Sequence, residues 1–229
     1  MALNTDKAPS VTNALKTRIT VRGFLDTPIP EDVLTRILTT ALRSPSGGNL
    51  QPWKAHVMTG KTLERFTSLA AEMTLSGKME APTHPPYPSP LWEPQRSWRY
   101  KLGEDMYALL GIEKDNKMGR MVQLAENAKF FGAPLGIIVT GNVKLEVPQY
   151  YDIGIWLQSI MLLAREAGLH TAPQGWWRSF NGLSHDILDI DEGEEVLVGL
   201  AMGYGDAEAS VNDLYADRAE LPEVTKFYK

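Results

Sequence analysis

The sequence predicts an α/β or α+β fold, because apolar segments of strand length alternate with segments of helical periodicity. The chain has 229 residues, which fits one domain. Hydrophobic residues make up 43% of it and charged residues 22%, the ordinary balance of a soluble globular protein. No internal repeat and no linker divides it. We therefore expect a single domain over residues 1–229.

The N-terminal part is predicted to contain a loose arm, two helices and a strand. Residues 1–12 show no periodic pattern and are expected to form the arm, which is able to become ordered against a partner. A helix is predicted over residues 30–42, since apolar side chains recur there every three or four positions. It should end before Pro45, because a residue preceding proline disfavours the helical conformation. A short strand is expected over 54–58, followed by an amphipathic helix over 61–75.

Residues 76–100 form a segment of different composition, for which no regular structure is expected. Its prolines are Pro82, Pro85, Pro86, Pro88, Pro90 and Pro94, and its large aromatic residues are Tyr87, Trp92, Trp98 and Tyr100. Aromatic side chains favour burial, which argues against disorder. We interpret the segment as an ordered insert that covers a pocket or contacts another subunit.

The C-terminal part is predicted to return to alternating helices and strands. Helices are expected over 103–110 and 117–130, and a strand over 135–140. A helix over 150–167 is apolar on nearly every side, which is typical of a helix that is central or lies between subunits. A nearly continuous apolar run predicts a strand over 196–202.

Charge and composition exclude several classes of partner. The formal net charge of −5 argues against nucleic acid, which basic surfaces bind. The N-terminus lacks the apolar core of a signal peptide. The apolar stretch over 153–164 is shorter than the ~20 residues that span a bilayer. We expect a cytoplasmic protein without a nucleic-acid or membrane partner.

No residue pattern predicts a metal site or a catalytic side chain. The absence of cysteine excludes thiolate ligands and cysteine nucleophiles. The sequence lacks the G-x-S-x-G motif of serine hydrolases and the G-x-G-x-x-G motif of stable nicotinamide sites. The histidines have no metal-ligand spacing and are expected to be surface or packed residues. They are His56, His84, His170 and His185.

Two segments near the N-terminus carry groups that suit a polar ligand. Arg18, Thr20 and Arg22 place two guanidinium groups and a hydroxyl close together, a combination that suits phosphate. The alternative is a solvated, charged helix end. Residues 45–53 combine two glycines, a hydroxyl and two carboxamides, which suits close approach to a polar heterocycle. The alternative there is an ordinary turn.

Two further segments lie in the C-terminal part. Residues 172–177 are predicted to form a glycine-containing turn, whose backbone N–H can point at a ligand while tryptophan faces line a flat pocket. The alternative is a connecting loop. Arg218 stands among Asp213, Asp217 and Glu220, so its alternative role is a surface ion pair.

Taken in order, these segments resemble the FMN-dependent nitroreductase family. Residues 18–22 are similar to its basic and hydroxyl signature, and residues 45–53 to its Pro-Ser-x-x-Asn-x-Gln-Pro-Trp segment. Residues 168–175 resemble its Gly-Leu-x-Thr turn, and Arg218 its arginine after a Gly-Tyr pair, here residues 203–204. The resemblance spans nearly the whole chain and keeps the family order.

The resemblance implies a fold and an assembly. The implied fold is nitroreductase-like, an α+β sandwich with a central, mostly antiparallel sheet flanked by helices. The family forms domain-exchanging homodimers with FMN at the subunit interface. The helix over 150–167 and the apolar C-terminal tail fit such a partner surface. The insert over 76–100 looks like the branch that reduces nitrobenzoate-type aromatics.

The resemblance also implies which residues bind FMN. The site residues within 18–22, together with Arg218, would hold the phosphate or the ribityl chain. The site residues within 45–51 would contact the ring or the ribityl hydroxyls. Residues 173–175 would lie against the isoalloxazine, with a backbone N–H facing N5. The full set is Arg18, Ile19, Thr20, Arg22, Pro45, Ser46, Gly47, Asn49, Gln51, Pro173, Gln174, Gly175 and Arg218. Ile19 stands where the family often has a second basic residue.

The implied function is an NAD(P)H oxidoreductase with a ping-pong mechanism. NADPH or NADH would reduce FMN and leave, and a nitroaromatic or other electron-poor aromatic compound would then take its place. Alternatives are a flavin-dependent reductive dehalogenase or another reductase on the same fold, a flavin-binding protein without turnover, or a protein that binds no flavin.

Overall fold

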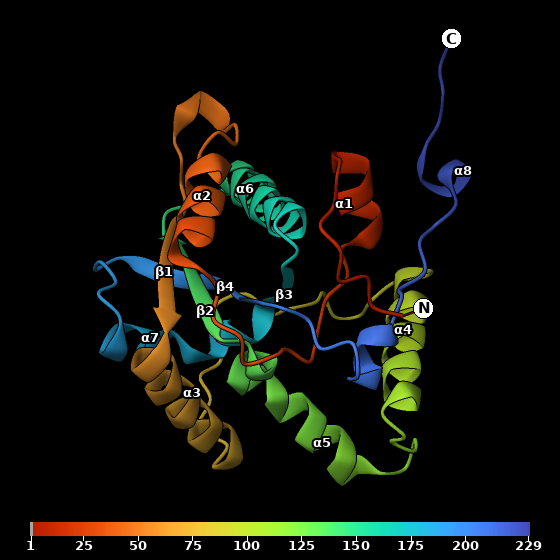
Figure 1. Cartoon of the computed structure of the whole chain (residues 1–229), viewed down its shortest axis with the longest axis horizontal. Coiled ribbons are helices and arrows are strands. Elements are labelled where there is room, and N and C mark those ends of the chain that lie inside the picture. The colour runs from red at the N-terminus through yellow and green to blue at the C-terminus, as the bar shows by residue number, and fades with distance from the viewer. Residues whose placement is uncertain (1) are drawn as a thin grey trace.

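A four-stranded antiparallel sheet forms the centre of the computed structural model, which describes residues 2–229 (Figure 1). Its strands lie in the order β1-β2-β4-β3. They are β1 (Lys54–Thr59), β2 (Leu135–Asn142), β3 (His170–Gln174) and β4 (Glu194–Gly203). The middle strands β2 and β4 are mostly buried, as their apolar sequences require. The predicted α+β fold with an antiparallel sheet is confirmed.

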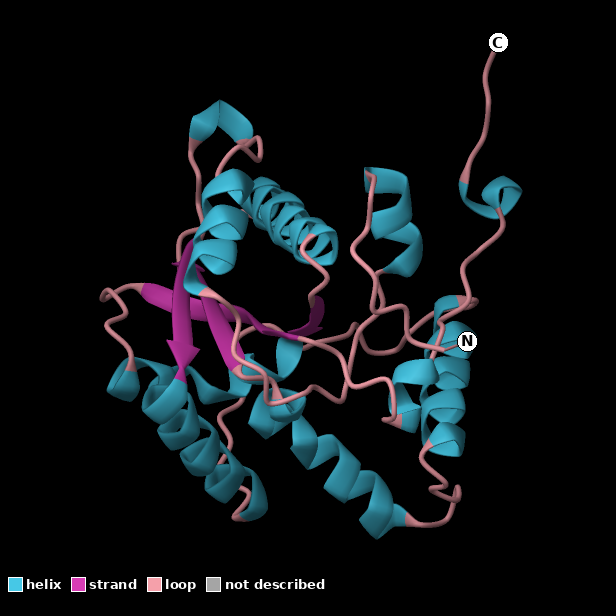
Figure 2. Cartoon of the chain, viewed as in Figure 1, coloured by secondary structure: helices cyan, strands magenta, loops and turns pink. Residues whose placement is uncertain are grey.

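Helices cover both faces of the sheet, with α2 and α6 on one face and α3 and α7 on the other, while α5 extends from η2 beside α3 (Figures 1 and 2). The α-helices are α1 (Val11–Thr17), α2 (Glu31–Ala41), α3 (Gly60–Leu75), α4 (Gln95–Leu109), α5 (Lys117–Ala125), α6 (Val147–Glu166), α7 (Asn181–Ile187) and α8 (Leu221–Val224). Four 3-10 helices are η1 (Gly47–Asn49), η2 (Glu126–Gly132), η3 (Gly175–Phe180) and η4 (Ser210–Asp213). Across residues 2–229, no helix has the length and hydropathy needed to cross a bilayer.

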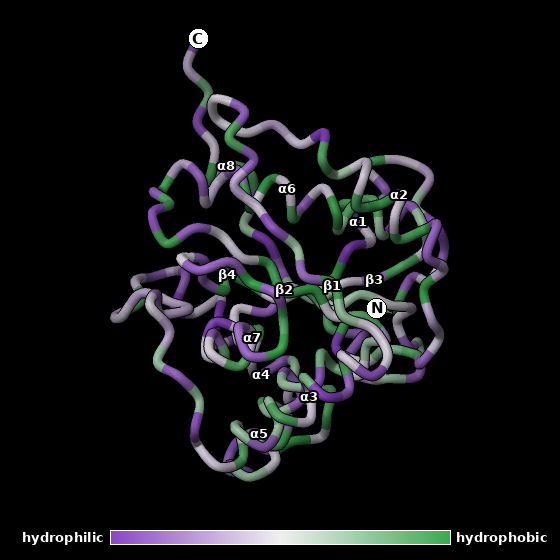
Figure 3. The backbone as a smooth tube through the Cα atoms, turned by 90° about the vertical axis from the view of Figure 1, so that its left-hand side faces the viewer, coloured by the Kyte–Doolittle hydropathy of each residue, from purple (hydrophilic) through white to green (hydrophobic). Residues whose placement is uncertain are grey.

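The sheet separates two apolar cores, and Figure 3 shows hydrophobic residues along its central strands. On the α2 and α6 face, the rings of Trp53 and Trp156 stack with centroids 5.6 Å apart. On the opposite face, the fully buried Trp177 stacks on Phe130 at 4.2 Å. A Cβ on Gly199 would lie 2.0 Å from Trp177 Cδ1, so only glycine fits in β4 beneath this ring.

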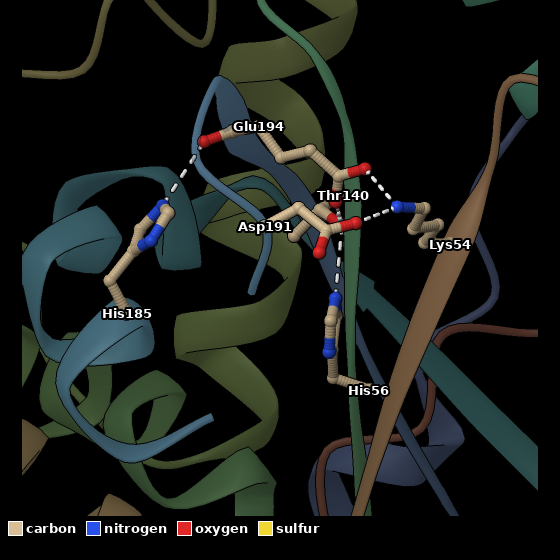
Figure 4. A network of polar contacts seen from close by, with 6 residues as sticks. All are labelled: Lys54, His56, Thr140, His185, Asp191 and Glu194. Atoms are coloured by element: carbon tan, nitrogen blue, oxygen red, sulfur yellow. Dashed lines mark hydrogen bonds and ion pairs between the residues drawn. The ribbon is translucent and has the colours of Figure 1, made fainter. Parts of the chain in front are cut away.

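A polar network closes the end of the sheet where β1 begins (Figure 4). Its residues are Lys54, His56, Thr140, His185, Asp191 and Glu194. The buried carboxylate of Glu194 accepts hydrogen bonds from Lys54 Nζ and from the Thr140 hydroxyl, both at 2.7 Å. Lys54 also pairs with Asp191. The network joins β1, β2 and the start of β4, which is a structural role.

The structure corrects the prediction for residues 76–100. Irregular backbone ends at Pro94, and α4 begins at Gln95, so Trp98 and Tyr100 lie on a helix. Every proline of the segment precedes the first helical residue, where proline does not interrupt the hydrogen-bond ladder. The predicted helix over 103–110 is therefore the second half of a longer one.

Two other predictions were also wrong. The N-terminal arm is not loose in this chain, because Leu3 and Ala8 are buried and the Arg165 guanidinium donates to the carbonyls of Asn4 and Asp6 at 3.0 and 2.7 Å. The turn expected over 172–177 begins instead as strand β3, followed by η3. Proline is compatible with β3 because that strand lies at the edge of the sheet.

Candidate cofactor site

The segment after α1 is held against the edge of the sheet. Arg18 caps α1 in an extended conformation and ends the helix. Thr20 then forms a parallel bridge with Thr171 of β3, and the Val21 N–H donates to the Thr171 carbonyl at 3.2 Å. These contacts cover the start of the open edge of β3. They also fix the position of the predicted phosphate-binding residues.

A pocket of about 280 Å³ lies beside this segment and gathers five predicted site residues. Arg18, Thr20 and Arg22 line it together with Arg218, which arrives from the other end of the chain. Ile19 is the fifth predicted residue, and the remaining lining residues are Leu15, Lys16, Leu102, Leu214, Tyr215 and Ala216. No acidic side chain is among them. The pocket is therefore a concave, positively charged site.

The arginines of this pocket lack the carboxylates that usually neutralise buried guanidinium groups. Burial, and secondarily the charge of Arg218, lowers the pKa of Arg18. Burial likewise lowers the pKa of Arg22. Within residues 2–229 neither arginine forms an ion pair, and Arg22 Nη1 donates only to the Thr20 carbonyl at 3.1 Å. Such a group of cations suits a multiply charged anion such as phosphate.

Within residues 2–229, Arg218 does not form the surface ion pair that its acidic neighbours suggested. Its Nη1 atom donates to the carbonyls of Ala216 and Asp217, at 2.9 and 2.8 Å. The Asp217 carboxylate instead pairs with Lys101 of α4 at 3.1 Å. This leaves the charge of Arg218 available to the pocket.

Residues 173–175 continue along the same sheet edge, away from the arginine pocket. At about 3.3 Å per residue, Gly175 lies roughly 13 Å from Thr171 along the strand direction. The Gln174 side chain is buried and fully engaged. Its Nε2 donates to the Asn127 carbonyl at 2.9 Å, and its Oε1 accepts from Trp177 Nε1 at 3.1 Å. At Gln174, only the backbone remains for a ligand.

The loop over residues 45–51 is rigid but lies elsewhere. Gly48, Asn49 and Gln51 have φ values of 57°, 57° and 47°, a strained conformation for non-glycine residues. The Gln51 N–H donates to the Ser46 hydroxyl oxygen at 3.0 Å, and the Gly47 N–H donates to both carboxylate oxygens of Asp152 at 3.2 Å. These bonds hold a conformation that leaves Asn49 and Gln51 exposed.

This loop does not reach the arginine pocket of its own chain. None of its residues, Pro45, Ser46, Gly47, Asn49 and Gln51 included, lines that pocket. In Figure 1 the loop is the orange segment above α2, separated from α1 and α4 by the width of α6. One chain therefore brings together residues 18–22, Arg218 and the β3 edge. It presents the remaining predicted segment, residues 45–51, on another surface.

Sequence reasoning missed several contributors to these sites, and Leu102 and Asp152 illustrate why. Leu102 lines the pocket from α4, and no motif marks it, because its role depends on how α4 packs. Asp152 anchors the loop, and a signal for it did exist. It is a carboxylate in a predominantly apolar helix, where a buried charge requires a partner.

Comparisons with known proteins agree with this arrangement. A model of the nitroreductase family matches residues 15–204. The 4-nitrobenzoate reductase of Pseudomonas putida is 35% identical over 99% of this chain and 98% of its own. The chloronitrobenzene nitroreductase of Comamonas testosteroni is 34% identical over 96% of this chain and 97% of its own.

Solved structures give the same result. The FMN and NADPH-dependent nitroreductase NfnB from Sphigopyxis sp. strain HMH superimposes with a TM-score of 0.92 and 38% identity, over 96% of this chain and 99% of that one. FMN-dependent NfnB from Mycobacterium smegmatis, solved in complex with NADPH, gives a TM-score of 0.90 and 26% identity, over 95% of this chain and 97% of that one.

Proposed function

Because this chain belongs to the nitroreductase family, we propose that it is an FMN-dependent NAD(P)H oxidoreductase that reduces nitroaromatic compounds. The observation that carries the proposal is the pocket in which Arg18, Arg22 and Arg218 meet without a carboxylate among its lining residues. Relatives that act on nitroaromatic compounds, and structural neighbours that use FMN and NADPH, support the same reading.

The residues of the arginine pocket fit the phosphate end of FMN. The guanidinium groups would supply charge-assisted hydrogen bonds, and the Thr20 hydroxyl a further one. Residues 173–175 would lie against the isoalloxazine, because they continue the edge that begins at the pocket. FMN, when bound, supplies the redox chemistry, and the protein supplies binding, orientation and electrostatics.

A homodimer would complete the site. The loop over residues 45–51 is preorganised but remote from the pocket of its own chain, so it would serve the pocket of the partner. Val147, Tyr151 and Ile155 form exposed apolar surface on α6. Contiguous exposed apolar surface is typical of an interface.

The C-terminal tail supports the same assembly. It leaves the body of the chain and ends far from it (Figure 1). Its large apolar side chains are exposed, which burial against a second subunit would relieve. They are Leu221, Val224, Phe227 and Tyr228. We infer that each tail packs on the partner in a domain-exchanging dimer.

The reaction would proceed in two balanced reductions. A nitroarene, NADPH and a proton would give the nitroso compound, NADP⁺ and water. The nitroso compound, a second NADPH and a proton would give the hydroxylamine and NADP⁺. Reductant and acceptor would use the same face of the site in turn, a ping-pong cycle, and NADH would serve as the alternative reductant.

Anaerobic spectroscopy tests this function. The purified protein should be yellow, NADPH should bleach it, and nitrobenzene or 4-nitrobenzoate should restore the colour. Bleaching without reoxidation by nitroarenes, but with release of iodide from iodotyrosine, would assign the chain to reductive dehalogenation. A yellow protein that NADPH does not bleach would be a flavin-binding protein only. A colourless protein that takes up no added FMN would refute the proposal.

A further inference from the structure

A second cavity lies next to η3, outside the arginine pocket. Its volume is about 170 Å³. Its walls come from the insert, the start of α6, η3, α7 and β4. The lining residues are Glu80, Ala81, Thr83, His84, Tyr150, Arg178, Asn181, Glu195, Val196 and Leu197.

The insert is fastened over this cavity by specific bonds. The Glu80 N–H donates to the Ser179 carbonyl at 3.0 Å, and the Gly182 N–H donates to the Glu80 carboxylate at 2.8 Å. The rings of His84 and Tyr150 meet edge to face, with centroids 6.1 Å apart. Residues 80–84 therefore form a defined wall and give the insert a role at this site.

Arg178 is the unusual residue in the lining. Within residues 2–229 it forms no ion pair and no hydrogen bond, and its Nε atom is buried without an acceptor. A buried donor left without a partner costs about 1–3 kcal/mol. Its Nη atoms also lack a partner among the described residues but are not buried, so a ligand that supplies acceptor oxygens can reach them.

The guanidinium of Arg178 lies beside Gly175, one of the residues assigned to the isoalloxazine. Its Nη2 atom is 3.2 Å from the position that a Cβ on Gly175 would occupy. A ligand held by Arg178 would therefore be adjacent to Gly175. This places the cavity next to the proposed redox centre rather than on an unrelated surface.

The size of the cavity limits what it can hold. An engineered cavity of about 150 Å³ in another protein binds benzene. A cavity of about 170 Å³ suits one substituted six-membered ring, not a fused bicyclic system. Tyr150, Val196 and Leu197 provide the apolar and aromatic contacts that such a ring needs.

Glu195 is an acidic residue in the lining of the cavity, in addition to Glu80. Its carboxylate lines the cavity without coming within ion-pair distance of Arg178. Burial, and secondarily Glu195, raises the pKa of Tyr150, so the phenol and this carboxylate are near each other. A carboxylate on the ligand would be repelled there.

We propose that this cavity binds the ring of an uncharged monocyclic nitroarene, whose nitro oxygens accept hydrogen bonds from Arg178. The inference rests on the proposed function and names its substrate class. Arg178 recognises the acceptor and Glu195 disfavours its carboxylated analogues. Nitrobenzene is therefore a better substrate than 4-nitrobenzoate.

Steady-state kinetics of the FMN-loaded enzyme test this assignment. In anaerobic NADPH oxidation, Arg178→Met should raise the KM for nitrobenzene about tenfold, the loss of one charge-assisted hydrogen bond. Ala81→Leu, which narrows the cavity from an exposed wall, should raise it as well. Glu195→Gln should raise kcat/KM for 4-nitrobenzoate relative to nitrobenzene. Arg36→Met, at an exposed arginine of α2, is the matched control.

The outcomes separate this inference from the function on which it rests. If the wild-type enzyme does not oxidise NADPH with any of the nitroarenes tested, the proposed function itself is overturned. Active wild type with an unchanged nitrobenzene KM in both Arg178→Met and Ala81→Leu overturns only the acceptor site. Loss of FMN absorbance in Arg178→Met would assign Arg178 to the cofactor and likewise overturn it.

Discussion

Arg18 and Arg218 come from opposite ends of the chain and line the same pocket, where the charge of Arg218 contributes to lowering the pKa of Arg18. Two like charges held this close destabilise each other unless an anion lies between them. The fold maintains this arrangement through hydrogen bonds from the Arg218 side chain to the backbone carbonyls of Ala216 and Asp217. We therefore propose that the pair is organised for a ligand and not for the stability of the unliganded chain.

The first prediction concerns this pair. Arg18→Ala should weaken FMN binding by about tenfold or more, because one charged phosphate contact contributes about 1.5–3 kcal/mol. The same change should leave the thermal stability of the FMN-free protein equal or higher, since it removes repulsion. Fluorescence titration with FMN and a melting curve measure the two effects, with Arg36→Ala as control. A large loss of stability without FMN would mean that Arg18 is structural.

The second prediction concerns the anchor of the 45–51 loop. Asp152→Ala removes both acceptors of the Gly47 N–H, so the strained loop should relax and FMN affinity should fall. Mixed dimers of Arg18→Ala and Asp152→Ala subunits then test which chain the loop serves. If it serves the partner, one site in each mixed dimer carries both defects and the other carries none. About half of the sites should therefore bind FMN normally.

The result for mixed dimers is unambiguous. A loop that served its own chain would leave one defect in every site, and no site would regain normal affinity. Equal FMN affinity in mixed and unmixed preparations would contradict the proposed dimer. Differently tagged subunits purified in tandem give the mixed species.

The third prediction concerns pH and His170. Burial, and secondarily Arg165, lowers the pKa of this histidine to about 4. Its neutral ring donates from Nε2 to the Asn4 carbonyl at 2.9 Å and accepts the Gly205 N–H at Nδ1, at 3.1 Å. A proton on Nδ1 breaks the second bond. Because the folded-state pKa lies below the unfolded value of about 6.5, stability is full above pH 6.5 and falls toward pH 4.

Urea unfolding at several pH values measures this contribution. The loss between pH 6.5 and 4 should approach roughly 3 kcal/mol from His170 alone. His170→Gln, which keeps a donor near Asn4 but cannot titrate, should be less stable at pH 7 and show a flatter pH dependence. An unchanged slope in the variant would exclude His170 as the titrating group.

The fourth prediction compares two glycines. Gly199→Ala places a methyl group 2.0 Å from Trp177 Cδ1 in the buried core, and should destabilise the protein by about 3 kcal/mol or more. Gly103→Ala, in α4, meets no atom within 4 Å and should be neutral or stabilising by up to about 1 kcal/mol. Chemical denaturation of both variants decides. Equal stabilities would show that Trp177 moves away at little cost.

Periodicity in the sequence predicted the elements with strong local patterns. The helices α2, α3 and α6 and the strands β1, β2 and β4 lie where apolar spacing indicated them, with ends shifted by a few residues. It missed β3, because a five-residue edge strand with a proline and a glutamine has no such pattern. It also extended α5 to residue 130, although Phe130 and Phe131 adopt left-handed φ values that end helical geometry.

The site was predictable in its parts but not in its geometry. Residues 18–22 and 45–53 were recognisable because each motif is local. That Arg218 joins the first segment depends on the path of the chain after β4, and that residues 45–51 lie on another surface depends on how α2 and α6 pack. The antiparallel sheet itself was implied by the family resemblance, not by apolar patterns.

The central claim is that the pocket of Arg18, Arg22 and Arg218 holds the phosphate of FMN. Comparing FMN with riboflavin, which lacks only the phosphate, tests it most directly. The wild-type protein should bind FMN at least about 100-fold more tightly than riboflavin. The double variant Arg18→Ala/Arg218→Ala should lose most of that preference while its riboflavin affinity stays unchanged. An FMN preference that survives in the double variant would contradict the assignment of the pocket.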